Sequence, residues 1–581
     1  MGEEELIMIE MSDIEHKLFF EELKRHNKEY DPEVMMIKRP FSSPGYHTTL
    51  KGGYVHPTRD SLTYAVALFD SGIDDNEKIA MDIVKKVISL QDTNRSNKTY
   101  GIWSWFYEEP LSKMSPPDWN WANFCGKELL QILLDYSNDL PDDLEKSIKN
   151  SIIHACNSII KRNVSIGYTN IAIMSAYVTI LAGELLGEKK IFDFGRNYLK
   201  RFYDYTISIG AFTEYNSPTY TMIALEDLSR MLNQIKDEDC LKMVGELSNM
   251  GWKCVAEHFH AHTNQWAGPH TRCYKTLQDD LFLSKIQLAT GGAVKFLDDE
   301  KLRITIDFPR IKLKCPEEYV HYFREDKERL IVQTFNKGKK LHLATSYLAK
   351  NFALGSFNVS DLWNQRRALV AYLGDSDNPV YFYLRCLHDG YDYSSAVLHS
   401  VQYKGDLLGI IDFATNGGDT HCNLDMIKDA TIKARDFRIR FEFGGAIDGI
   451  QLDKSENTFI CKSNNVNIKI HMLYCCFGNF RIDYKIGERK DIKYADIILY
   501  SGDPISIRFK ELPQAVCAFC LNINSDNGGM PEIIKDKNNE MIRVEYNIHD
   551  RKLMLEADMK AKGMSELFLN SKDNITTLKL I

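Results

Sequence analysis

The spacing of hydrophobic residues changes once along this 581-residue chain. From about residue 60 to 290, apolar side chains recur at i, i+3, i+4 and i+7, as in "EKIAMDIVKKVISL" and "IAIMSAYVTILAGELLG". This period predicts amphipathic helices. The connections between them are short and hold Gly, Asn, Asp and Pro. We therefore expect a series of antiparallel helical hairpins.

After about residue 300 the apolar residues alternate with polar ones in short runs. "RIRFEFG", "NIKIHMLY" and "AVCAFCLNI" are rich in Val, Ile and Phe, and turn signals such as "TNGGDT" and "NSDNGG" separate such runs. This pattern predicts an antiparallel β-sandwich. Helices followed by strands indicate two domains, which we place at residues 1–300 and 301–581.

Composition narrows the class of protein. Hydrophobic residues make up 44% and charged residues 26% of the chain, as in soluble globular proteins. The net charge of -9 argues against non-specific nucleic-acid binding. We find no apolar run of membrane-spanning length. The N-terminus has no signal-peptide pattern and the 13 cysteines are scattered, so we expect a cytoplasmic protein unless a leader has been removed.

The stretch "GAFTEYNSPTYTMIALEDL" carries the first candidate site. Ser217 is a good N-cap and Pro218 suits the first helical position, which puts Tyr220 in the first turn. The positive end of the helix favours an anion there, including a phenolate. Glu214 and Tyr215 add polar groups for substrate binding. The alternative is that Tyr220 only packs at a helix end.

A second stretch, "SIGYTNIAIMSAYVTILAGELLG", has the same design. Asn170 stands near the start of a strongly apolar helix. If the helices form a ring of hairpins, the starts of alternate helices share one face, so Asn170 and Tyr220 could line the same mouth. The alternative for Asn170 is simple N-capping.

The third stretch is "HFHAHTNQWAGPHTRCY". His270, Arg272 and Tyr274 alternate after a Gly-Pro turn, which suggests a loop facing the substrate. His258 and His262 have i, i+4 spacing, as in some metal sites. No third ligand and no HExxH glutamate accompany them, so we expect no cofactor, with a divalent metal as the alternative.

Further candidates lie in two other segments. In "GIWSWFYEEPLSKMSPPDWNWANF", Trp105 and Trp119 could stack on sugar faces and Asn123 could bind hydroxyls, although a core plug is the alternative for any single Trp. In the β half, the candidate polar side chains that could reach a helical mouth are Arg366, His388 and His421.

Together these features resemble the heparinase II/III-like polysaccharide lyases, which pair an α/α toroid with a C-terminal β-sandwich. "TEYNSPTYTMIALEDL" resembles the family's Phe-x-Glu-x-Ser-Pro-x-Tyr-type segment, with Tyr220 at the catalytic Tyr. "YTNIAIMSAYVTILAGELLG" resembles its Asn-Asn-His segment, with Asn170 at the second Asn; Thr169 and Ile171 replace the flanking Asn and His. A His from the sandwich is also usual in the family, and His270 or His388 could take its place.

The resemblance implies β-elimination on an acidic polysaccharide or oligosaccharide that contains uronic acid. Tyr220 would take the C5 proton and return one to the leaving oxygen, while Asn170, helped by Arg272 or a His, would neutralise the carboxylate. Two alternatives stay open. One is a glycoside hydrolase on the same toroid, using Glu214 and Asp118. The other is a non-catalytic carbohydrate-binding protein on a lyase fold. The oligomeric state is left open.

Overall fold

A computed structural model describes residues 9–337, 341–419, 424–463, 465–525, 529–536, 538, 540–548 and 551–570. The described residues form two compact units. The helical unit contains residues 1–208, 222–252 and 279–317; the β unit contains residues 209–221, 253–278 and 318–581. Two connecting segments from the helical half thus belong to the β unit. The predicted division at residues 300 and 301 stays a prediction.

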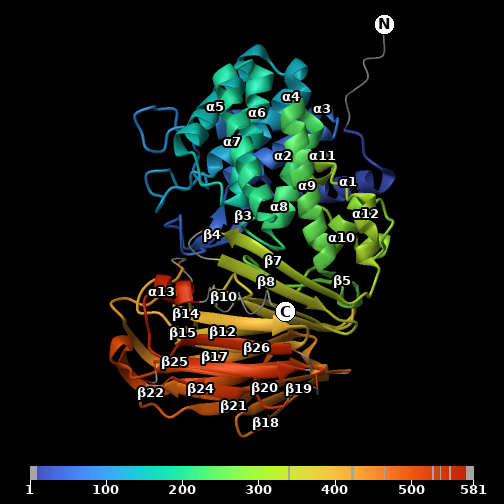
Figure 1. The fold of residues 1–581 in the computed structure, drawn as a ribbon. Coiled ribbons are helices and arrows are strands. Elements are labelled where there is room, and N and C mark those ends of the chain that lie inside the picture. Colours follow the sequence, from blue (N-terminus) through green and yellow to red (C-terminus); the bar gives the residue numbers. More distant parts are fainter. Residues whose placement is uncertain are drawn as a thin grey trace. The chain divides into compact units, whose positions relative to one another are not determined.

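The helical unit is built from hairpins, as the 3.6-residue period predicts (Figure 1). The first helix of each hairpin is strongly apolar, and α2, α4 and α6 pack side by side. Gly183 and Gly195 allow α6 and α7 to approach closely, because a Cβ on Gly183 would lie 2.5 Å from Phe192 Cβ. The helices are α1 Asp13–Asn27, α2 Thr58–Asp70, α3 Asp74–Ile88, α4 Trp121–Tyr136, α5 Asp142–Arg162, α6 Thr169–Leu186, α7 Lys189–Ile209, α8 Tyr220–Gln234, α9 Glu238–His258, α10 Asp280–Ala289, α11 Phe308–Ile311 and α12 Glu317–Val320.

Helix α6 corrects one prediction from the sequence. By length and composition alone it is apolar enough to cross a membrane, although no run of that kind was expected. Because 83% of it is buried inside the protein, its apolar residues on every side are those of a central core helix.

The β unit consists of stacked antiparallel sheets (Figure 1). The ten-stranded sheet has the order β21-β22-β17-β12-β11-β9-β8-β7, with β13 and β16 at its side, and the seven-stranded sheet has the order β10-β14-β15-β23-β20-β19-β18. Apolar side chains such as Phe382, Phe441 and Phe519 form the main core. This confirms the predicted β-sandwich.

A third layer was not predicted. The three-stranded sheet β24-β25-β26 packs Val544 and Leu555 against Ile410 and Val516 of the seven-stranded sheet.

The larger strands are β7 Arg329–Lys337, β8 Leu341–Leu348, β9 Ala353–Phe357, β10 Val359–Asp361, β11 Leu369–Gly374, β12 Pro379–His388, β14 Ala396–Tyr403, β15 Asp406–Phe413, β17 Thr431–Gly445, β18 Ile450–Ser455, β19 Thr458–Ser463, β20 Val466–Phe477, β21 Asp483–Arg489, β22 Ile492–Arg508, β23 Ala515–Ile523, β24 Glu532–Lys535, β25 Met541–Ile548 and β26 Arg551–Asp558. The shorter ones are β1 Tyr30–Asp31, β2 Met36–Ile37, β3 Arg39–Ser42, β4 Gly52–Val55, β5 Phe259–His260, β6 Gln265–Trp266, β13 Tyr391–Tyr393 and β16 Leu424–Asp425.

Candidate active site

The start of α8 is organised by Ser217. Its hydroxyl accepts a hydrogen bond from the Tyr220 backbone N–H at 3.1 Å and donates one to the Arg272 carbonyl at 2.7 Å. Ser217 therefore caps the helix as predicted and also ties it to the segment that carries Arg272. The helix itself begins at Tyr220 rather than at Pro218. Asn216 before it has a left-handed φ of 49°, which turns the chain into the cap.

Three polar side chains meet at this helix start. The Tyr220 and Tyr274 hydroxyls lie 2.8 Å apart. Arg272 donates from Nη2 to the Tyr220 hydroxyl at 3.1 Å, and its guanidinium carbon lies 4.7 Å from the centre of the Tyr220 ring. The alternating positions predicted to face the substrate, Arg272 and Tyr274, are thus brought to Tyr220 in the β unit.

Arg272 contacts two aromatic rings. Its guanidinium carbon lies 4.6 Å from the centre of the Trp363 ring and 4.7 Å from the centre of the Tyr220 ring. Nη2 also donates to Gln365 Oε1 at 2.9 Å. Burial alone would lower the pKa of Arg272, but the negative charge available from Tyr220, Tyr274 and Glu214 raises it. Arg272 is therefore a fixed, permanent cation beside a phenol oxygen.

Beside this cluster the β unit has a cavity of about 330 Å³. Glu214 reaches it with a carboxylate oxygen 3.7 Å from Arg272 Nη1. Arg366 lines it as well and pairs with Asp361, so the site contains two guanidinium groups. The whole lining is Thr213, Glu214, Thr271, Arg272, Phe335, Asn336, His342, Phe357, Val359, Ser360, Trp363, Arg366 and Asp419. The carboxylates of Glu214 and Asp419 stand beside the two guanidinium groups in this lining, so the cavity offers charged donors and acceptors of both signs, which suits a polar ligand such as a sugar.

His270, predicted to be catalytic, lies inside the β unit. It is completely buried, and burial lowers its pKa to about 3. The neutral ring donates from Nδ1 to the Asn216 carbonyl at 2.6 Å, so Nε2, 2.9 Å from the Tyr372 hydroxyl, acts as an acceptor. The catalytic role of His270 stays a prediction; in this structure the buried ring anchors the loop that carries Arg272.

Tyr215, predicted to bind substrate, has structural contacts in the β unit. Its side chain is buried and stacks on Phe335 with ring centres 5.1 Å apart. Its hydroxyl is 2.9 Å from His258 Nε2, while His258 Nδ1 donates to the Cys254 carbonyl at 2.8 Å. Both nitrogens of His258 are thereby occupied. Among the described residues, no group of three or more His, Cys, Asp or Glu side chains is placed to hold a metal.

The loop that carries Arg272 lies tightly against strand β9. A Cβ on Gly355 would lie 2.0 Å from the Gly268 carbonyl oxygen, which Ser346 holds by a hydrogen bond of 2.7 Å. Next along the loop, His270 and Arg367 form a backbone bridge. Together these contacts hold the loop against the sheet and so position Arg272, through His270, Gly355 and Ser346.

Several predicted residues belong to the helical unit, which we describe by itself. Asn170 is the second residue of α6 and is buried, so its predicted place at a helix start is confirmed. Trp105 stacks on Trp121 at 5.1 Å, and Trp119 donates to the Lys98 carbonyl at 3.1 Å. Both Trp105 and Trp119 are half-buried, which leaves part of each ring open to a ligand.

Two other candidates are buried, and their roles in binding stay predictions. Asn123 donates to Ser175 Oγ at 2.8 Å and so joins α4 to α6. His388 at the end of β12 is buried between Tyr393 and Phe437, with Nε2 3.1 Å from the Lys433 carbonyl. It does not line the cavity. His421 lies outside the described residues.

The sequence analysis missed three residues of the site: Trp363, Gln365 and His342. His342 is the histidine from the sandwich that lines the cavity, and it contacts Phe335 with ring centres 5.4 Å apart. The sequence feature that could have pointed to His342 is the alternation in "KLHLATSYL". This alternation puts His342 on the same face of β8 as the buried Ala344. Gln365 gave no signal, because an exposed-looking glutamine in a loop has no pattern of its own.

Comparison with known proteins places the fold. The chain matches the chondroitin AC lyase of Streptomyces coelicolor A3 in complex with chondroitin sulphate with a TM-score of 0.51 at 10% identity, over 93% of this chain and 84% of that one. This chain has a polysaccharide-lyase fold. The lyase fold agrees with the predicted toroid of helical hairpins and antiparallel β-sandwich.

Further comparisons give these values. Heparinase III matches with a TM-score of 0.47 at 12% identity, over 96% of this chain and 93% of that one. A heparan sulfate lyase mutant from Pedobacter heparinus matches with a TM-score of 0.39 at 10% identity, over 87% of this chain and 82% of that one. Residues 16–287 match a domain of unknown function, DUF8769. No curated protein sequence matches this chain.

Proposed function

We propose that this protein is a polysaccharide lyase that cleaves uronic-acid-containing glycans by β-elimination. The observation that carries the proposal is the Tyr220–Arg272 pair at the edge of a cavity with a second guanidinium. A phenol held against a fixed cation is suited to lose and regain a proton. The solved structure with a TM-score of 0.51 is a lyase in complex with chondroitin sulphate, which supports an acidic glycan as the substrate.

The proposed reaction needs one proton carrier. Tyr220, as the phenolate, takes the proton from C5 of the uronic acid; the C4–O bond breaks, and a double bond forms between C4 and C5. The tyrosine then returns a proton to the leaving oxygen. Arg272 stabilises the phenolate before the reaction, since its Nη2 already donates to the hydroxyl at 3.1 Å.

The substrate carboxylate must be neutralised for the C5 proton to become acidic. In the β unit, Arg366 and Arg272 both line the cavity and can supply positive charge to an anionic sugar. Asn170, in the helical unit, remains the predicted amide partner of the carboxylate. Trp363 holds both cations in place, since the guanidinium carbons of Arg272 and Arg366 lie 4.6 and 5.6 Å from the centre of its ring.

Glycoside hydrolysis is a weaker alternative. Of the two carboxylates considered for it, Asp118 in the helical unit already accepts hydrogen bonds from Trp105 Nε1 at 3.3 Å and from the Asn120 N–H at 2.9 Å. Glu214 has a carboxylate oxygen 3.7 Å from Arg272 Nη1, so this carboxylate already pairs with a cation. A tyrosine beside an arginine therefore fits elimination better than hydrolysis.

The test is a screen of heparan sulfate, chondroitin sulfate, hyaluronan and alginate with the purified protein. Elimination creates an unsaturated uronide that absorbs in the ultraviolet, together with a new reducing end. We expect both signals on at least one of these polymers. New reducing ends without ultraviolet absorbance would establish a hydrolase, and binding without either signal would establish a carbohydrate-binding protein.

A further inference from the structure

The helical unit contains a larger cavity, of about 600 Å³, that the proposed reaction does not use. Its walls come from the first two turns of three helices, through Arg59 and Thr63 of α2, Phe124 and Lys127 of α4, and Ile223 of α8. The side chain of Arg59 is 42% exposed, so the cavity reaches the surface. Its volume lies within the range of small-ligand sites.

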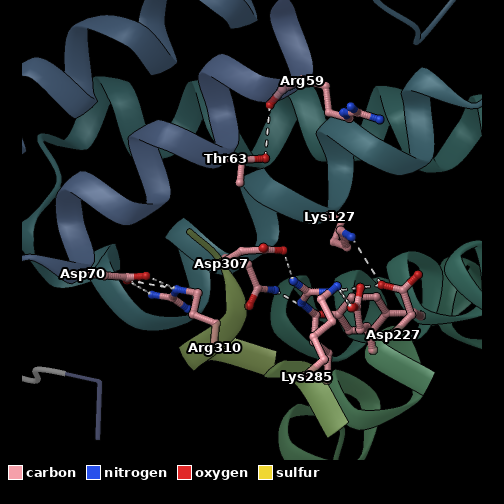
Figure 2. A network of polar contacts seen from close by, with 12 residues as sticks. Arg59, Thr63, Asp70, Lys127, Asp227, Lys285, Asp307 and Arg310 are labelled. Carbon is pink, nitrogen blue, oxygen red and sulfur yellow. Dashed lines mark hydrogen bonds and ion pairs between the residues drawn. The ribbon is translucent and has the colours of Figure 1, made fainter. Parts of the chain in front are cut away.

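Ion pairs hold the walls of this cavity in place (Figure 2). Lys127 of α4 donates to Asp227 of α8 at 3.3 Å, and Arg230 bridges Asp227 at 3.3 Å and Asp307 at 2.6 Å. Lys285 of α10 pairs with Glu226. Because these contacts join helices far apart in sequence, the wall is rigid before any ligand arrives.

Glu128 is a further carboxylate in the wall of this cavity. It lines the cavity and is only 5% exposed, while the hydrogen bonds and ion pairs of this wall run between Lys127, Asp227 and Arg230. Burial raises its pKa, although Lys127 and Arg230 work in the opposite direction. Because its side chain lines the cavity, the carboxyl can hydrogen-bond a ligand there.

The other groups around Glu128 indicate the chemical class of ligand that the cavity could bind. Lys127 spends one of its three N–H donors on Asp227 and keeps the others for the cavity. Phe124, Met174 and Ile223 supply an apolar surface. The lining holds as many Asp and Glu side chains as Arg and Lys side chains, so no net charge favours an ion. Hydroxyl groups, which both donate and accept, fit this mixture better than a cation or an anion.

We propose that this cavity is a second carbohydrate site, which binds the ring of a neutral sugar. Glu128 and Lys127 hydrogen-bond its hydroxyls, and Phe124 packs against its C–H face. Tyr220 does not line this cavity; α8 reaches it through Ile223, one turn further along. Its ligand differs from the acidic sugar proposed for the cavity of the β unit.

The test measures binding of methyl glucoside to the full chain by saturation-transfer NMR, with glucuronate and glucosamine as charged comparators. We expect binding to the wild type and equally to Tyr220→Phe. Glu128→Leu removes the carboxyl and should weaken binding by about tenfold or more, in line with a lost hydrogen bond to a charged group. Its melting temperature should stay the same or rise, because an apolar side chain takes the place of a buried carboxyl.

Two controls make the result decisive. Glu145→Gln changes a carboxyl on α5 that does not line the cavity and should bind like the wild type. Phe124→Leu keeps an apolar side chain but loses the flat ring, and should weaken binding without unfolding the protein. No methyl glucoside binding to the wild type, unchanged binding to Glu128→Leu, or tighter salt-sensitive binding of glucuronate at this site would each overturn the proposal.

Discussion

The guanidinium of Arg272 donates a hydrogen bond to the Tyr220 hydroxyl at 3.1 Å while it lies 4.7 Å from the centre of the same ring. One cation thus contacts both the face and the oxygen of the phenol. The contact at the oxygen would stabilise negative charge that develops there in the proposed reaction. The guanidinium carbon also lies 4.6 Å from the centre of the Trp363 ring, which helps to hold the cation in place.

Arg272→Ala should therefore impair catalysis as well as binding. Loss of the hydrogen bond to Tyr220 should lower kcat, and loss of positive charge in the cavity should raise KM. By analogy with the removal of one preorganised donor, kcat should fall by roughly 10²- to 10³-fold. Steady-state kinetics on a substrate found in the polymer screen measures both effects.

The salt dependence of the same variant gives an independent check. Added salt screens the attraction between cations and an anionic substrate, so KM should respond less to salt in Arg272→Ala than in the wild type. Arg508→Ala, with a side chain 62% exposed on β22, is the matched control and should change neither constant. A normal kcat with a raised KM would restrict Arg272 to substrate binding.

Gly355→Ala tests whether the β sheet positions the Arg272 loop. The new Cβ would lie 2.0 Å from the Gly268 carbonyl oxygen, and a backbone atom cannot yield as a side-chain end can. We expect a destabilisation of ~1–3 kcal/mol and a loss of activity. Gly449→Ala meets no heavy atom within 4 Å and is the matched control. Equal melting temperatures of Gly355→Ala and the wild type would contradict this loop geometry.

The pH dependence of stability should reveal the buried histidines of the β unit. Burial lowers the pKa of His258 and His260 to about 4 and that of His270 to about 3. In the unfolded chain a histidine has a pKa of about 6.5, so below that pH the unfolded state binds protons that the folded state does not. The free energy of unfolding should fall as the pH falls from about 6.5 to 4, by up to ~1.4 kcal/mol per pH unit for each histidine.

Denaturant titrations at pH 7, 6 and 5 measure this loss. His260→Gln should make the decline with pH shallower, because one depressed histidine is removed. His321→Gln changes an exposed histidine and should leave the decline as it is. A free energy of unfolding that stays constant between pH 7 and 5 would show that these rings are not buried as neutral groups.

The sequence predicted the parts of this protein that follow from local pattern. The helical period of apolar residues predicted α6, and their alternation predicted β23. In both segments the spacing of the apolar residues matches the buried face. The Ser217 cap was predictable since an N-cap needs only neighbours in sequence. Arg272 and Tyr274 were found by their alternation after a Gly-Pro turn.

Contacts between segments far apart in the chain could not be predicted from the sequence. The burial of His270 by strands about a hundred residues further on leaves no local trace: its Nε2 partner is Tyr372. The same holds for Asn123, whose partner Ser175 lies on another helix. Gln365 and His342 enter the site only through the folding of the sheet around it.

The most direct test of the central claim is the rate of unsaturated-uronide formation by Tyr220→Phe. Phenylalanine keeps the half-buried ring and removes the hydroxyl that Arg272 and Tyr274 contact, so the melting temperature should change little. Tyr391→Phe, 65% exposed in the same unit, is the control and should retain full activity. We predict that Tyr220→Phe loses at least roughly 10⁴-fold in rate, at the upper end for acid-base catalysis. A folded Tyr220→Phe with a near-wild-type rate would contradict the account.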